Sequence, residues 1–144
     1  MARPKSYRDL IVWQKAMALA RHVYKVTENL PRREAYGLTD QIRRAAVSVA
    51  SNVAEGYGRL SDLQFRHFLG TARGSLFEMQ TQVELATDLG YLKDDDGREL
   101  MEQSSEVGRI LNGLLASLKS SNCNANSANP ANSANPASKA VHVP

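Results

Sequence analysis

Four segments of the chain repeat apolar residues three and four positions apart, the period of a helix that turns one side toward a core. The segments cover about residues 9–27, 38–57, 61–89 and 95–118. No stretch alternates apolar and polar residues in the way of a half-buried strand. Because short connections join long helices, neighbours in sequence should run antiparallel. The sequence therefore predicts an all-α fold, an antiparallel up-down-up-down four-helix bundle.

Helix ends and core faces follow from local patterns. Ser6 and Asp9 have the spacing of a helix start, and Ser61 with Gln64 has that of a capping box. Gly90 is placed to end the third helix. The expected core stripes are Leu10, Trp13, Met17, Ala20 and Tyr24 on the first helix, Leu38, Ile42, Ala46, Val49, Val53 and Tyr57 on the second, Phe65, Phe68, Leu69, Ala72, Leu76, Met79, Val83 and Ala86 on the third, and Leu100, Ser104, Val107, Leu111, Leu114 and Leu118 on the fourth.

The composition changes after Lys119. We expect the bundle to occupy residues 1–119 and a disordered tail to occupy residues 120–144, where the sequence ANSANP occurs twice in succession. Asn, Ser, Ala and Pro bury too little apolar surface to offset the entropy lost on ordering. The single cysteine, Cys123, has no partner for an internal disulfide, which fits a reducing compartment. Neither a membrane span nor the apolar part of a signal peptide is present, so a cytoplasmic location and no membrane partner are predicted.

Charge is unevenly distributed along the chain, whose net charge is +3. Residues 1–60 carry eleven Lys and Arg against five Asp and Glu, a net of +6, whereas residues 61–119 carry six against ten, a net of −4. A basic half of this kind binds a polyanion or docks on an acidic surface of another copy. The candidate nucleic-acid-binding residues are Lys25, Arg32, Arg33, Arg43, Arg44 and Arg59.

Motifs of known catalytic or metal-binding chemistry are missing from the sequence. Di-iron bundles need Glu-x-x-His on two helices, and no glutamate here has a histidine three residues later. The run Asp94–Gly97 resembles part of a calcium loop, but Leu92 and Gln103 then fall where that loop needs carboxylates. No phosphate-binding loop or nucleophile elbow is present. We therefore expect a protein that is not an enzyme and that uses no cofactor or metal.

A polar stripe runs beside the apolar face of the second helix. Its members, spaced three and four apart, are Gln41, Arg44, Ser48, Asn52 and Glu55. We interpret Gln41, Ser48, Asn52 and Glu55 as a structural hydrogen-bond network, with Glu55 placed to pair with the loop after Gly56. The alternative is a ligand or catalytic site that uses Asn52 and Glu55.

Two helices have more apolar surface than one bundle core needs. On the first, a second stripe beside the expected core face widens the apolar arc to roughly 200°. On the third, a second ridge lies opposite the core face and includes glycines that allow close approach. Surplus apolar surface of this kind marks an interface, so self-association is expected. The predicted interface residues are Val12, Leu19, Val23, Leu63, Gly70, Gly74 and Phe77.

Several short motifs occur in the order of a known family. They are Trp13-Gln14-Lys15-Ala16, Tyr36-Gly37-Leu38, Gln41-Ile42-Arg43-Arg44-Ala45-Ala46, Asn52-Val53-Ala54-Glu55-Gly56 and Gly74-Ser75-Leu76-Phe77-Glu78. Over about residues 5–118 the chain resembles the bacterial 23S rRNA intervening-sequence four-helix-bundle family. The resemblance implies a homopentameric ring of bundles with no established activity. It also implies a relation to the accessory proteins of diversity-generating retroelements, which bind a reverse transcriptase and contact nucleic acid.

These observations favour one function and leave a second open. We expect a non-catalytic, homo-oligomeric accessory protein whose basic surface binds RNA or a nucleoprotein partner such as a reverse transcriptase. The alternative is a protein-binding adaptor or scaffold with no nucleic-acid role, in which the basic half serves subunit contacts.

Overall fold

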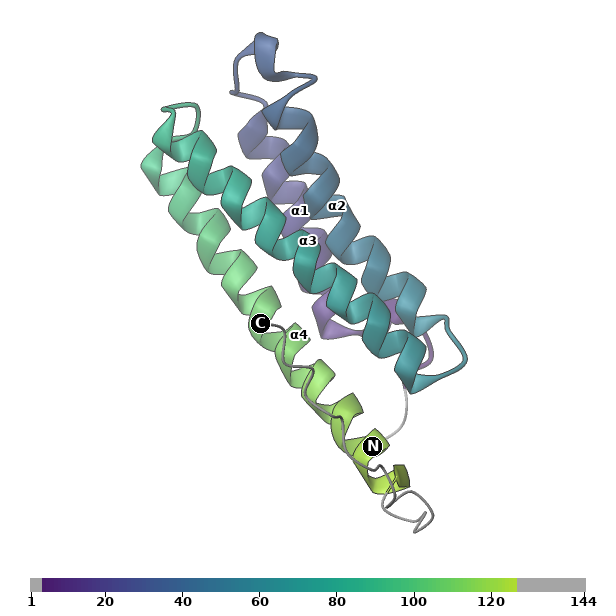
Figure 1. Ribbon diagram of the computed structural model, residues 1–144. Helices are drawn as coiled ribbons and strands as arrows, with labels where there is room; N and C mark the ends of the chain where they lie inside the picture. The colour runs from purple at the N-terminus through teal and green to yellow at the C-terminus, as the bar shows by residue number, and fades with distance from the viewer. Residues whose placement is uncertain (1–3, 127–144) are drawn as a thin grey trace, which may run out of the picture.

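The computed structural model describes the backbone of residues 4–126 and side chains up to residue 119. The main helices are α1 (Ile11–Thr27), α2 (Leu38–Tyr57), α3 (Asp62–Asp88) and α4 (Asp94–Asn126), and short 3-10 turns η1 (Tyr7–Asp9) and η2 (Arg32–Glu34) precede α1 and α2. Figure 1 shows the four helices side by side with short connections at alternate ends. The predicted antiparallel four-helix bundle is confirmed.

Each helix packs against two others. α2 lies between α1 and α3, and α4 closes the bundle by packing against both α3 and α1. Within residues 4–126, α1 does not contact α3 and α2 does not contact α4, so these pairs stand on the diagonals. The α2–α3 contact is the most extensive, and Gly56 explains part of it. A Cβ at Gly56 would lie 2.6 Å from Cβ of Phe68, so only glycine allows this approach.

The core confirms the predicted faces of three helices. Ile42, Val49 and Val53 of α2 are fully buried, as are Leu69 and Leu76 of α3. α4 contributes Leu100, Val107 and Leu111, together with a buried serine at the expected position. That serine, Ser104, accepts a hydrogen bond from Gln80 Nε2 at 2.9 Å and donates one to the Met101 carbonyl at 2.9 Å. The hydroxyl is therefore satisfied inside the α3–α4 contact.

The face prediction for the first helix is largely wrong, because Ala20 is the one member of the predicted stripe that is buried. The stripe that faces the core is Val12, Ala16, Leu19, Val23 and Val26, all buried within the single chain. Trp13 and Met17 are half-buried, and Tyr24 is 46% exposed. Small and branched aliphatic side chains fill the narrow interior, whereas Trp and Tyr are suited to an edge where the polar end meets water. Val12, Leu19 and Val23 are thus core residues, and their assignment to an oligomer interface is corrected.

Local signals place most helix ends correctly. The Ser6–Asp9 capping box is present, but it caps η1, and α1 begins only at Ile11. Ser61 Oγ accepts the Gln64 N–H at 3.2 Å at the start of α3. Gly90, with φ of +77°, follows the end of α3.

The fourth helix is longer than predicted. α4 continues beyond Leu118 to Asn126, and Figure 1 shows it running past the α2–α3 turn. No proline occurs between Lys119 and Asn126 to stop the helix, although the apolar period has ended. From residue 127 on, the predicted disordered tail lies outside the described residues. Over the part that is described, none of the helices is both long enough and apolar enough to cross a membrane.

Candidate functional site

Arg43, one of the predicted nucleic-acid-binding residues, is a structural residue of the α1–α2 pair. Its Nε donates to Thr27 Oγ1 at 2.9 Å and its Nη2 donates to the Tyr24 carbonyl at 3.3 Å. The guanidinium carbon lies 4.7 Å from the centre of the Tyr24 ring. Carbonyls in the last turn of a helix lack helical partners and accept such donors. Arg43 therefore ties α2 to the C-terminal turn of α1.

Arg33 joins the two loops at the same end of the bundle. Its Nη2 donates to the Tyr91 hydroxyl at 3.4 Å, and its guanidinium carbon lies 5.6 Å from the Tyr91 ring centre. The Tyr91 hydroxyl in turn donates to Glu34 Oε1 at 3.3 Å. The hydrogen bond to Tyr91 raises the pKa of the Arg33 guanidinium, which is charged at any physiological pH. These contacts link η2 to the loop between α3 and α4.

The remaining predicted cations fall into two groups. Arg44 pairs with Asp40 (Nη1 to Oδ2, 3.7 Å), and Arg59 pairs with Glu55 (Nη2 to Oε1, 3.8 Å). Lys25 and Arg32 are exposed and have no partner in the described part of the chain. Lys25, Arg32, Arg33, Arg43 and Arg44 lie toward the α1–α2 loop, whereas Arg59 follows the other end of α2. A helix as long as α2 spans about 30 Å, so Arg59 does not belong to the same patch.

The predicted polar network exists, but it reaches onto α3 and omits Glu55. Asn52 Nδ2 donates to the Ser48 carbonyl at 2.8 Å and to Ser48 Oγ at 3.0 Å. Ser48 Oγ is hydrogen-bonded to Ser75 Oγ at 2.8 Å across the α2–α3 contact. A second link runs from Gln82 Nε2 to Gln41 Oε1 at 3.4 Å. These bonds fix the register of α2 against α3, which supports the structural interpretation.

The apolar period of α3 does not indicate its two partners in this network. Ser75 and Gln82 lie seven residues apart on the side of α3 that faces α2. Their spacing repeats that of Gln41 and Ser48, and this matching period in two helices was the available signal. Glu55 pairs with Arg59 in the loop after Gly56, as predicted. No hydrogen bond joins Glu55 to Asn52 in the described structure.

Histidine and acidic side chains form no metal centre in the described portion, since no three of them come close enough to share an ion.

His22 lies in the seam between α1 and α4. Its Nδ1 is 2.7 Å from Gln103 Oε1, and its Nε2 is 3.5 Å from Glu99 Oε2. These contacts account for His22 as a helix-pairing residue.

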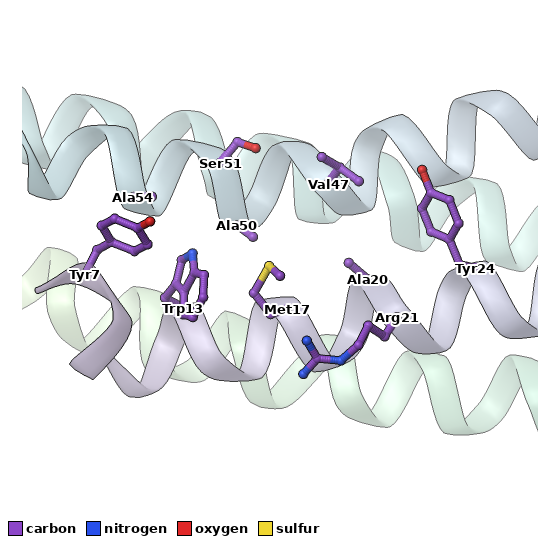
Figure 2. Close-up of a pocket in the computed structure, with 10 residues that line it drawn as sticks. All are labelled: Tyr7, Trp13, Met17, Ala20, Arg21, Tyr24, Val47, Ala50, Ser51 and Ala54. Atoms are coloured by element: carbon purple, nitrogen blue, oxygen red, sulfur yellow. The ribbon is translucent and has the colours of Figure 1, made fainter.

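An apolar groove on the outside of the α1–α2 pair is lined by most residues of the stripe that was predicted as the core face of α1. Figure 2 shows Trp13, Met17 and Tyr24 of α1 opposite Val47 and the small residues of α2. The groove has a volume of about 540 Å³. Its lining residues are Tyr7, Trp13, Met17, Ala20, Arg21, Tyr24, Val47, Ala50, Ser51 and Ala54. We call this feature the α1–α2 groove, and no carboxylate lines it.

The outer side of α3 is a second uncovered surface. Leu63 is 67% exposed, Phe77 49% and Leu85 48%. Gly70 and Gly74 lie on the same side, and nothing is within 4 Å of the position a Cβ would take at either residue. Leu63, Gly70, Gly74 and Phe77 are therefore on the surface, where the sequence placed them. We call Gly74, Phe77 and Leu85 the α3 ridge.

Comparison with known proteins bears on the whole bundle. A crystal structure of a protein of unknown function from the S23 ribosomal protein family of Bacteroides thetaiotaomicron VPI-5482 has the same fold, with a TM-score of 0.69 at 20% sequence identity. The likeness covers 74% of this chain and 96% of that one. No curated protein matches the chain. The family profile described as 23S rRNA-intervening sequence protein matches residues 8–113, from η1 well into α4. Because that match includes all four helices, the chain belongs to the 23S rRNA-intervening sequence protein family.

Proposed function

We propose that this protein is a non-catalytic accessory protein that assembles with copies of itself and contacts RNA or a nucleoprotein partner through a basic surface. One observation supports it above all. The single chain leaves an apolar groove uncovered on α1 and α2 and an apolar ridge uncovered on α3. Apolar surfaces that remain after the core is complete mark binding to another protein.

The shapes of the two surfaces favour head-to-tail assembly. The α1–α2 groove is concave and is floored by Ala20 and Ala50, whereas the α3 ridge projects Phe77. α1 and α3 stand on a diagonal of the bundle, so the groove and the ridge face different directions. Contact between unlike surfaces of successive copies gives a ring when the rotation closes. The family resemblance implies that the ring has five subunits.

The proposed RNA contact uses the basic end of the α1–α2 pair. Lys25 and Arg32 are free of partners in the described structure, and Arg44 has only an exposed ion pair with Asp40. Exposed pairs of this kind are weak, so Arg44 remains available to a phosphate. A ring would repeat this patch in every subunit and strengthen each weak contact through multivalency.

Assembly is tested by light scattering after size-exclusion chromatography. Val47→Asp places a charge in the groove and Phe77→Asp places one on the ridge, and both positions are exposed in the single chain. Each variant should stay helical and lose the oligomeric mass. Ser105→Asp, at an exposed position of α4, is the matched control and should keep the mass of the unaltered protein. A monomeric mass for the unaltered protein at micromolar concentration contradicts self-association.

RNA contact is tested with the pair Arg32→Glu and Arg44→Glu, leaving Arg43 in place because it anchors α1. Binding should weaken, and its dependence on salt should become shallower because fewer counterions are released. The alternative function is favoured by the intrachain hydrogen bonds that occupy Arg33 and Arg43. Oligomers that bind no RNA at low salt would establish the adaptor or scaffold.

A further inference from the structure

The acidic half of the chain contains two stretches that have no Asp or Glu. Residues 63–77 of α3 and residues 107–119 of α4 contain no Asp or Glu. The same two stretches carry Arg66, His67, Arg73, Arg109 and Lys119. These two stretches therefore carry a net charge of +4 while the rest of residues 61–119 carries −8, and this part of the α3–α4 surface is basic.

A hollow lies on this basic surface over Gly70. Its volume is about 540 Å³, and it is lined by Leu63, Arg66, His67, Gly70, Thr71 and Arg73 of α3 with Leu115 of α4. Nothing is within 4 Å of where a Cβ of Gly70 would be, so the missing side chain forms part of the depression. We call it the α3 hollow. A second depression of about 490 Å³ adjoins it at Leu63 and His67 and extends it to Arg59.

The cations of the α3 hollow have few partners of their own. Arg66 makes no hydrogen bond or ion pair with any described residue, and its Nε is buried without an acceptor. The Arg73 guanidinium carbon lies 5.2 Å from the centre of the Phe77 ring and is not paired with an acid. This is the reverse of Arg43 and Arg33, which are committed to contacts within the chain. Positive charge at the hollow is therefore available to an external anion.

The spacing of these groups fits a chain of phosphates. Arg66 and Arg73 are seven residues apart on one side of α3, which separates them by about 10 Å along the helix. The exposed His67 lines the hollow, and its ring centre is 5.9 Å from that of Phe68 in an edge-to-face arrangement. Single-stranded nucleic acid is bound by cations that follow the backbone together with rings on which bases stack. A duplex offers no free base face to such a ring.

We infer that the α3 hollow binds single-stranded nucleic acid, with phosphates at Arg66 and Arg73 and a base against His67. The inference rests on the proposed nucleic-acid role but uses a different surface from the α1–α2 end. It also assigns Leu63 and Gly70 to this hollow and leaves the α3 ridge for contact between copies. The sequence did not indicate the site because the net charge of residues 61–119 is negative.

The test measures binding of a fluorescent single-stranded oligoribonucleotide and of a duplex to the full chain across a range of salt concentrations. Arg66→Glu with Arg73→Glu should weaken single-strand binding at least about tenfold, and the salt slope should fall by about 1.4 as two phosphate contacts are lost. Arg32→Glu with Arg44→Glu changes the net charge equally and should weaken binding less. His67→Ala should weaken binding about fivefold or more. Circular dichroism and light scattering check that every variant is folded and assembled as before.

The possible results separate the two proposals. Loss of binding confined to the Arg32 and Arg44 variant overturns the hollow and leaves the proposed function standing. Equal loss in both double variants, or a duplex bound as tightly as the single strand, also overturns the hollow. If the unaltered protein binds no nucleic acid at low salt, the hollow and the proposed nucleic-acid role are both wrong.

Discussion

α1 and α3 stand at opposite corners of the bundle, and each carries more apolar residues than one core face needs. In α1 the second stripe is half covered by α2 and forms a groove. In α3 the second set lies on the outer side of the bundle, interrupted by glycines and flanked by arginines. One stripe of each helix builds the core of the monomer, and we propose that the other serves for binding. Three comparisons of paired variants and one truncation follow, from the largest expected effect to the smallest.

Val23 and Tyr24 are neighbours in sequence on the two stripes of α1. Val23 is fully buried, so Val23→Asp places an unpaired charge in the core and should cost about 3–5 kcal/mol in the free energy of unfolding. Tyr24→Asp, at an exposed position, should cost far less. Chemical denaturation measures both. Similar losses in the two variants would mean that the core face of α1 has been misidentified.

Gly56 lies inside the α2–α3 contact, and Gly70 lies on the outer side of α3. Alanine substitutions at these two positions therefore compare a buried site with an exposed one. Gly56→Ala forces a Cβ to within 2.6 Å of Phe68 Cβ and should destabilise the protein by about 1–3 kcal/mol. Gly70→Ala meets open space and should stabilise the helix by about 0.5–1 kcal/mol. In thermal unfolding, Gly56→Ala should lower the midpoint temperature and Gly70→Ala should raise it. A lower midpoint temperature in both variants would show that other residues pack against the outer side of α3.

Arg43 and Arg44 are adjacent cations with different surroundings. Arg43→Ala removes the hydrogen bonds to Thr27 and the Tyr24 carbonyl and should cost about 1–2 kcal/mol. Arg44→Ala removes one exposed pair with Asp40 and should change stability by about 0.5 kcal/mol or less. Equal effects in urea denaturation would argue against Arg43 as the link between α2 and α1.

Truncation after Lys119 should have the smallest effect. Among the side chains of α4 that the structure describes, up to residue 119, the last fully buried one is Leu111, and Leu118 is only partly buried. Removing residues 120–144 should therefore leave the midpoint of thermal unfolding nearly unchanged. A large drop in a calorimetric scan would show that this segment packs on the bundle.

The fold was predictable because helix period, breakers and caps all agree. α2 begins and ends where its pattern placed it, and Gly90 follows α3 as expected. The core face of α1 was not predictable from period alone, since two adjacent stripes are both apolar. Their difference is one of size and polarity: aliphatic residues at Val12 and Val23, aromatic ones at Trp13 and Tyr24.

The candidate surfaces were less predictable, because charge was counted along the sequence while binding depends on which charges lack partners. Arg43 belongs to the basic half yet serves the fold, whereas Arg66 belongs to the acidic half and has no partner in the described structure. The two arginines are distinguished by their contacts with other helices, which the sequence alone does not show.

In the proposed assembly, the α1–α2 groove of one copy receives the α3 ridge of the next. Val47→Asp disables the groove and Phe77→Asp disables the ridge, so each variant alone should be a monomer. In an equimolar mixture, the intact groove of the Phe77 variant should still accept the intact ridge of the Val47 variant. Light scattering should then show a mass of two subunits and no larger species. A mixture that remains monomeric would contradict head-to-tail contact between these two surfaces.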